Sequence, residues 1–144
     1  MVKTYGRIYK TEGIVIKRKN YGESDRILTI FTRQTGKILV RAAGVRKITS
    51  RRSPHVELLN LSLFSLYKGR AFPIVTEVTT LDDFSMIKRS LKKIGFAYYM
   101  CELIERLCAE NQEHRAVFPL IISFLARLEE EQDEARLIHE FEVA

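Results

Sequence analysis

Cysteine and histidine are scarce in this sequence of 144 residues. Two cysteines, Cys101 and Cys108, are too few for a disulfide framework or for a four-thiolate zinc site. The three histidines, His55, His114 and His139, lack metal-ligand spacing among themselves and with the cysteines. We therefore expect no metal and no cofactor, and we expect both thiols to be buried and unreactive.

Long hydrophobic runs and enzymatic motifs are also missing. No stretch approaches the roughly 18 uncharged apolar residues that cross a bilayer, and the N-terminus lacks an apolar signal core. Glycine motifs that bind nucleotide phosphates are absent, and Ser24 has the wrong neighbours for a nucleophile elbow. The sequence therefore predicts a cytoplasmic protein that is neither a membrane protein nor an enzyme.

Positive charge is unevenly distributed along the chain. Residues 1–80 hold 16 Lys and Arg against 5 Asp and Glu, whereas residues 81–144 hold 8 against 13. Six of the seven glycines also lie before residue 81. We therefore expect two domains, over residues 1–81 and residues 82–144. The net charge of +6 makes polyanions the expected partners.

The first part of the chain has the short apolar runs of antiparallel strands. Runs rich in Ile, Val, Leu, Thr and aromatic residues are each closed by a turn signal. They predict five strands, at residues 10–19, 27–33, 37–42, 55–67 and 74–81. A change of phase between Leu63 and Phe64 predicts a bulge in the fourth strand. Five strands in about 75 residues favour a small closed barrel of the OB type.

After residue 81 the apolar residues recur every three or four positions, as in helices. One long helix is predicted from Phe84, with Asp82 or Asp83 as its cap and a stop near Asn111. Two more helices are predicted at residues 115–130, with Pro119 in the first turn, and at residues 133–142. The last one has no capping signal, so we expect the helical domain to continue beyond this chain. The predicted fold is α+β, with an N-terminal five-stranded OB-fold barrel followed by an α-helical domain.

An interval without acidic residues is the most informative functional feature. Residues 26–56 contain eight bases, and four of them lie in the predicted loop 44–54. A loop of this composition attracts phosphates, and beside a basic barrel strand it predicts a groove for nucleic acid. A solvated loop is the alternative. The predicted contacts are Arg26, Arg33, Lys37, Arg41, Arg46, Lys47, Arg51, Arg52 and Arg70, with Tyr21 (or Phe72) as a platform for base stacking.

A second basic cluster lies at the start of the predicted long helix. It consists of Lys88, Arg89, Lys92 and Lys93. The cluster fits an extension of the nucleic-acid track or a docking site for an acidic peptide of a partner protein, and a solvated helix face is the alternative.

Several segments, in their order along the chain, resemble one bacterial family. They are Glu12-Gly13-Ile14-Val15-Ile16-Lys17, then residues 21–32 with the sequence YGESDRILTIFT, then Gly36-Lys37 and Ala43-Gly44-Val45-Arg46-Lys47. The likeness continues through residues 66–70 and 81–84. This order is similar to the N-terminal domain and following helices of the RecO recombination mediators, which act in DNA repair.

The resemblance implies a DNA-binding protein without enzymatic turnover. RecO proteins bind single- and double-stranded DNA, anneal complementary strands, and work with RecR and the single-stranded DNA-binding protein, which has an acidic tail, to help load RecA. The motif carries over most directly to Arg26, Lys37, Arg46 and Lys47 as DNA contacts. Family members are usually longer, and many carry a four-cysteine zinc module that has no counterpart in this sequence.

Two functions from other classes remain open on the sequence alone. One is an adaptor that docks a protein partner on the helical half, with DNA binding secondary. The other is an OB-fold RNA-binding protein, since such a groove does not distinguish the two sugars unless a residue reads the 2′-hydroxyl group.

Overall fold

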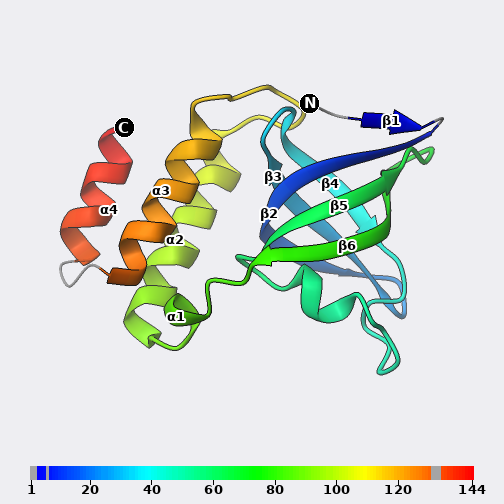
Figure 1. Cartoon of the computed structure of the whole chain (residues 1–144), viewed down its shortest axis with the longest axis horizontal. Coiled ribbons are helices and arrows are strands. Elements are labelled where there is room, and N and C mark those ends of the chain that lie inside the picture. The colour runs from blue at the N-terminus through cyan, green and yellow to red at the C-terminus, as the bar shows by residue number, and fades with distance from the viewer. Residues whose placement is uncertain (1–2, 6, 131–133) are drawn as a thin grey trace.

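The computed structural model describes residues 3–5, 7–130 and 134–144. A sheet and a group of helices lie side by side (Figure 1). The strands are β1 (Lys3–Tyr5), β2 (Ile8–Tyr21), β3 (Asp25–Thr32), β4 (Gly36–Ala42), β5 (Leu61–Tyr67) and β6 (Ile74–Asp82). The helices are a 3-10 helix, η1 (Ser53–Val56), and the α-helices α1 (Ser85–Lys88), α2 (Leu91–Leu107), α3 (Val117–Glu130) and α4 (Glu134–Val143).

Five of the strands close into a ring. The hydrogen-bonded order is β2-β3-β4-β6-β5, and β5 pairs back with β2. All neighbours are antiparallel except β4 and β6, which meet in parallel at Arg41 and Ile74. This order, with a short helix between the third and fourth strands of the ring, is the arrangement of an OB fold. The predicted α+β class is therefore confirmed, and β1 is an additional strand paired to β2.

The interior of the ring is apolar because its strands alternate inward and outward side chains. In β4 every second residue is buried, including Ile38, Val40 and Ala42, as the sequence predicts. These side chains share a core with Leu28 and Phe64 from other strands of the ring. Val56 of η1 also belongs to this core, whereas none of its residues comes from α1 to α4.

A second core joins the outside of the ring to the helices. Ile14, Ile16 and Phe31 are buried on the outer face of β2 and β3, where they pack with residues of α2 and α3 such as Met100 and Ile121. The strands give way to helices between Asp82 and Ser85. The domain division at residues 81 and 82 stays a prediction, since the two parts share this core.

The predicted fourth strand is wrong over its first half. Residues 53–56 form η1, with Pro54 in the first turn where its missing N–H costs no helical bond. Leu59 then adopts φ 73°, and the strand begins at Leu61. The register shifts lie beside Leu61 and beside Ser65, rather than at the predicted bulge. The change of phase arises because β5 packs on both faces: Leu61 packs against the core shared with the helices, whereas Phe64 and Leu66 lie in the core inside the ring.

The predicted long helix is also wrong, because it is two helices. Asp82 and Asp83 do cap its start, accepting hydrogen bonds from the backbone N–H groups of Phe84 (2.8 Å) and Ser85 (3.1 Å). Helix α1 ends at Lys88, and Ser90 has an extended backbone. The hydroxyl of Ser90 accepts a hydrogen bond from the N–H of Lys93 at 3.2 Å and so caps the start of α2.

The remaining helix boundaries agree more closely with the sequence. Helix α2 ends at Leu107, and Asn111 lies beyond it with φ 58°. Helix α3 starts two residues after the predicted point, with Pro119 in its first turn. Helix α4 covers the third predicted helix except its first residue, which lies outside the described residues.

Gly36 fixes how the segment after α2 returns to the sheet. Its φ is +69°, and an added Cβ would lie 2.0 Å from the carbonyl oxygen of Gln112. Next to it, the N–H of Asn111 donates to the carbonyl of Lys37 at 2.7 Å. Only a glycine permits this close approach of backbone to backbone.

Replacing Gly36 by Ala is therefore expected to lower the free energy of unfolding by about 3 kcal/mol or more, from the left-handed φ and the backbone clash together. Urea unfolding measures the loss. Gly22→Ala is the matched control, because Gly22 has φ +63° with open space around it, and about 1 kcal/mol is expected there. Equal losses in the two variants would show that the Gln112 segment does not pack on Gly36.

Candidate nucleic-acid interface

An aromatic pair joins two loops at one end of the ring. Tyr21, at the end of β2, and Phe72, in the loop between β5 and β6, have ring centroids 6.4 Å apart at 83°. The guanidinium of Arg41, from β4, lies 5.3 Å from the centroid of the Tyr21 ring. Tyr21 is 44% exposed. In OB folds these two loops and the strand face between them form the surface for oligonucleotides.

Asp25 fixes the position of Arg41 beside the aromatic pair. One carboxylate oxygen accepts from Nε and Nη2 of Arg41 at 2.8 and 2.6 Å, and the other accepts from the N–H of Gly44 at 2.7 Å. The hydrogen bond from Gly44, reinforced by Arg41, lowers the pKa of Asp25 below its ordinary range. Asp25 thereby orients Arg41 beside Tyr21 and fixes the first residue of the basic loop.

The basic loop, residues 44–52, is anchored at both ends by two of its own arginines. The N–H of Arg46 donates to the carbonyl of Ser24 at 2.9 Å, and its guanidinium donates to the carbonyl of Gly22. The guanidinium of Arg52 donates to the carbonyls of Ala43, Val75 and Thr76, each at 3.3 Å. The guanidinium groups of these two arginines therefore shape the loop.

Lys47 and Arg51 differ from Arg46 and Arg52 because their side chains are exposed. Arg70, in the loop that also carries Phe72, is exposed as well. Arg26 lies on β3, where its Nε donates to the side chain of Asn20 at 3.4 Å, and partial burial lowers its pKa. Lys47 and Arg51 lie on the basic loop, which is hydrogen-bonded through Arg46 to the turn after Tyr21. Arg70 lies on the loop of Phe72, and Arg26 lies on the strand that follows the turn after Tyr21.

Arg33 and Lys37 lie at the other end of β3 and β4. Arg33 pairs with Glu12 at 2.9 Å, and its guanidinium lies 4.5 Å from the ring centroid of Phe118 in α3. The amino group of Lys37, only 12% exposed, donates to the backbone carbonyl of Glu105 at 2.8 Å. Both remain predicted DNA contacts, but the structure uses them at the junction with the helices.

The second basic cluster is largely engaged within the chain. Lys88 donates to the side chain of Asn60, and partial burial lowers the pKa of Lys88. Lys93 donates to the carbonyl of Glu129 at 2.7 Å, at the end of α3. The remaining contacts are Lys92 with Glu134 (3.4 Å) and Arg89 with the sulfur of Met86 (3.9 Å). These four residues therefore stay a prediction as a partner site.

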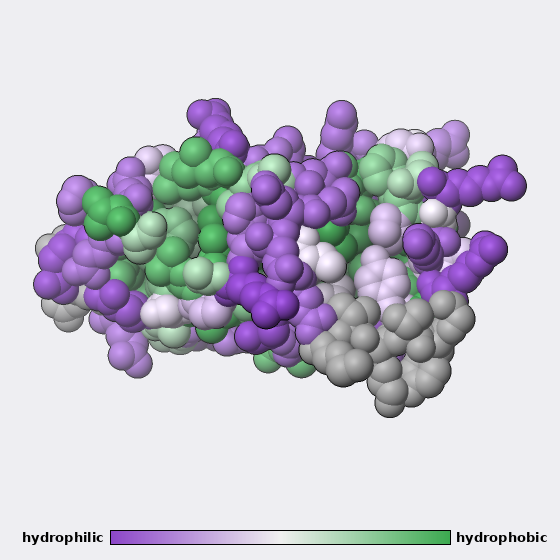
Figure 2. All heavy atoms as spheres, turned by 90° about the horizontal axis from the view of Figure 1, so that it is seen from above, coloured by the Kyte–Doolittle hydropathy of each residue, from purple (hydrophilic) through white to green (hydrophobic). Residues whose placement is uncertain are grey.

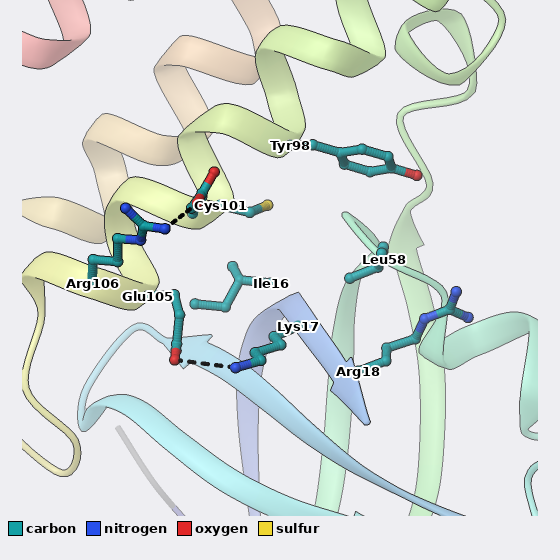
Figure 3. Close-up of a pocket in the computed structure, with 9 residues that line it drawn as sticks. Ile16, Lys17, Arg18, Leu58, Tyr98, Cys101, Glu105 and Arg106 are labelled. Carbon is teal, nitrogen blue, oxygen red and sulfur yellow. Dashed lines mark ion pairs between the residues drawn. The ribbon is translucent and has the colours of Figure 1, made fainter. Parts of the chain in front are cut away.

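A cavity of about 470 Å³ separates β2 from α2 (Figure 3). Two ion pairs lie in its walls, Lys17 with Glu105 at 3.6 Å and Arg106 with Glu102 at 2.7 Å. The third lining cation, Arg18, pairs with Glu57 at 3.1 Å. Because each cation faces a carboxylate, this cavity offers little attraction to a phosphate.

The helical half has a more apolar surface. Figure 2, the view from above, shows hydrophobic residues gathered over the ends of α2, α3 and α4, beside a hydrophilic band that adjoins the sheet. The exposed side chains there include Leu107 and Val143. A groove of about 280 Å³ at this end is lined by Leu107, Val117, Leu120 and Phe141, among others.

The two cysteines lie inside the fold. In the part of the chain that the structure describes, no group of three or more His, Cys, Asp and Glu side chains is arranged to hold a metal. Cys101 and Cys108 are buried, as predicted. Burial raises the pKa of Cys101 to about 12 and also raises the pKa of Cys108.

Among the described residues, no helix is both long and apolar enough to span a bilayer.

Two models of one protein family match this chain over most of its length. Residues 7–84 match the family model described as Recombination protein O N terminal, and residues 88–144 match Recombination protein O C terminal. DNA repair protein RecO of Roseiflexus sp. is 40% identical over 122 residues, or 85% of this chain and 43% of that protein. DNA repair protein RecO of Dehalococcoides mccartyi (strain BAV1) is 36% identical over 135 residues, or 94% and 53%. The chain spans about half the length of the curated relatives it matches.

Asp25→Asn tests whether one carboxylate organises the interface. At pH 7 we expect a loss of about 2 kcal/mol in the free energy of unfolding, because the amide carries no charge and keeps only one acceptor oxygen, so either Arg41 or the N–H of Gly44 loses its acceptor. Since folding lowers the pKa of Asp25, its contribution is present above about pH 4 and is lost as the pH falls through the lowered pKa.

Chemical denaturation from pH 7 down to pH 2 provides the measurement, and the wild type and Asp25→Asn should converge at the acid end. Glu23→Gln, an exposed carboxylate in the same turn, is the control, with an expected change within about 0.5 kcal/mol. A difference between wild type and Asp25→Asn that is independent of pH would contradict the proposed role of the charge.

Proposed function

The chain belongs to the RecO family of DNA repair proteins, and we propose that it binds single- and double-stranded DNA on the OB ring without reading sequence and anneals complementary strands. The observation that carries the proposal is the meeting of Tyr21, Arg41 and Phe72 between the two loops that bind oligonucleotides in OB folds. We also infer that the chain acts without enzymatic turnover.

The proposed binding mode uses charge for affinity and rings for contact with bases. Lys47, Arg51 and Arg70 are exposed cations that neutralise backbone phosphates, which releases counterions and makes binding fall with salt. Tyr21, already flanked by Arg41 and Phe72, offers a ring face or edge to an unpaired base. None of these contacts depends on base identity.

Annealing follows from the same arrangement. Two complementary strands repel each other through their phosphates, and a cationic surface that holds one strand reduces the repulsion felt by the second. RecR, the single-stranded DNA-binding protein with its acidic tail, and indirectly RecA are the proposed partners, on the strength of the family. The second basic cluster, Lys88, Arg89, Lys92 and Lys93, is the proposed site for an acidic peptide.

A protein-docking adaptor is the second candidate function. The apolar groove among α2, α3 and α4 supports it, because exposed apolar surface of this kind is typical of protein contacts. An RNA-binding protein is a variant of the first proposal that uses the same ring. Competition between DNA and RNA oligonucleotides of matched sequence distinguishes the two nucleic acids.

The central experiment removes two loop charges that the structure leaves exposed. Fluorescence anisotropy with a single-stranded oligonucleotide across a salt series gives the slope of log K against log salt. Lys47→Gln combined with Arg51→Gln is expected to make that slope shallower by about 1.4, from about 0.7 for each lost phosphate contact. Arg46 and Arg52 are left intact because they shape the loop.

The control carries the same change of net charge on the helices. Arg106→Gln combined with Arg127→Gln removes two exposed cations that pair with Glu102 and Glu140. The slope should match the wild type. An equal change of slope in both double variants would reduce the effect to overall charge, and absence of binding by the folded wild-type chain at low salt would overturn the proposal.

Tyr21 provides an independent test of base contact. Tyr21→Leu keeps an apolar side chain but removes the ring, and we expect single-strand binding to weaken by about 1–3 kcal/mol. Tyr21→Phe keeps the ring and should bind within about twofold of the wild type, because stacking depends on the π face. If the leucine variant binds as well as the wild type, Tyr21 is not a stacking platform.

A further inference from the structure

The basic loop carries one apolar residue that the structure leaves entirely uncovered. Ile48 is fully exposed, although burial of an isoleucine side chain is favourable. Its neighbours Lys47, Thr49 and Arg51 are exposed too, so no core is formed around it.

The backbone explains why Ile48 projects. Two turns follow one another, closed by hydrogen bonds from the N–H of Lys47 to the carbonyl of Gly44 (3.1 Å) and from the N–H of Ser50 to the carbonyl of Lys47 (3.0 Å). Ile48 is the first corner residue of the second turn. The side chain of a corner residue points away from the chain segments that precede and follow the turn. The hydrogen bonds of Arg46 and Arg52 hold the two ends of the basic loop and so fix this turn.

Beside this corner lies a polar hollow of about 470 Å³. It is lined by Gly44, Lys47, Thr49, Ser50, Arg51, Arg52 and Thr76. Cations, hydroxyl groups and a glycine backbone are the groups that proteins use for a phosphate. The loop thus presents a polar, cationic hollow and an apolar side chain at adjacent positions, and a nucleotide likewise has its phosphate and its base at adjacent positions.

We propose that Ile48 packs against an unstacked base while the hollow beside it holds the adjoining phosphate, and that this pairing makes the loop prefer single-stranded over duplex DNA. The inference rests on the proposed function. In other DNA-binding proteins, apolar side chains, isoleucine among them, insert at the base steps of a duplex only by unstacking them, which costs energy. An unpaired base in a single strand already exposes its face, so this cost is avoided there. In a duplex both faces of each base are already covered, so Ile48 gains little there.

A lipid surface would also offer phosphates and apolar contact. The structure favours nucleic acid, because a single isoleucine buries too little to anchor a protein on a bilayer. The loop is also tied to the turn before β3 through Gly22 and Ser24, next to Tyr21. A strand leaving the hollow therefore meets the aromatic pair.

The experiment compares wild type, Ile48→Ala and Ile48→Ser for binding to a single-stranded oligonucleotide and to the matching duplex. We expect about tenfold weaker single-strand binding in each variant, and a change within about twofold for the duplex. The salt slope should stay unchanged because no charge is removed. Leu107→Ala, another exposed apolar residue but on α2, is the control and should bind like the wild type.

A 2-aminopurine base in the single strand reports unstacking directly. Its fluorescence should rise on saturation with the wild-type chain and stay near the value of the free oligonucleotide with Ile48→Ser. Equal loss of single-strand and duplex affinity would overturn the proposal, as would wild-type fluorescence in the Ile48→Ser complex. Both results leave DNA binding by the ring intact.

Two further outcomes distinguish a failure of the role proposed for Ile48 from a failure of the proposed DNA binding. If the wild type binds neither oligonucleotide, the proposed function fails, and the role of Ile48 fails with it. If the wild type sediments with phosphatidylserine vesicles in a manner that requires Ile48, while DNA binding does not require it, the loop recognises a lipid surface and the proposal is overturned.

Discussion

Strands β2 and β3 bury apolar side chains on both of their faces, and the rest of the arrangement depends on this. Val15 and Ile30 point into the ring, whereas Ile14 and Phe31 point out of it into the core shared with the helices. A ring with such an outer face needs a cover. The helices supply it, and the backbone contact at Gly36 fixes where the chain returns to the sheet.

The same junction decides which positive charges remain available. The helical part is rich in acids, and it meets the ring where Lys37 contacts Glu105. Cations at that end are therefore neutralised within the molecule. At the opposite end of β4, the carboxylate of Asp25 orients Arg41 and the backbone of Gly44, while Lys47 and Arg51 stay exposed. The ring thus has a structural end and an end suited to polyanions.

Periodicity and turn signals were sufficient to predict the OB ring, but not its irregular parts. Pro54 lies in the first turn of a 3-10 helix within an apparent strand. The hydroxyl of Ser90 caps a new helix and thereby interrupts what periodicity alone predicts as one helix. For the interface, counting bases found the loop but could not tell Arg52, which donates to three carbonyls, from the exposed Arg51. Ile48 was missed, although an isolated apolar residue in an acid-free loop is a signal that sequence alone provides.

If the proposed function holds, the arginines that anchor the basic loop also affect how quickly a bound strand dissociates. A loop with several like charges would otherwise sample many conformations, and ordering it would oppose binding entropically. Here Arg46 and Arg52 fix the backbone at both ends of the loop, so the entropy is lost when the chain folds. In the proposed binding mode, few contacts then suffice to hold a strand, and few must break before the strand pairs with its complement.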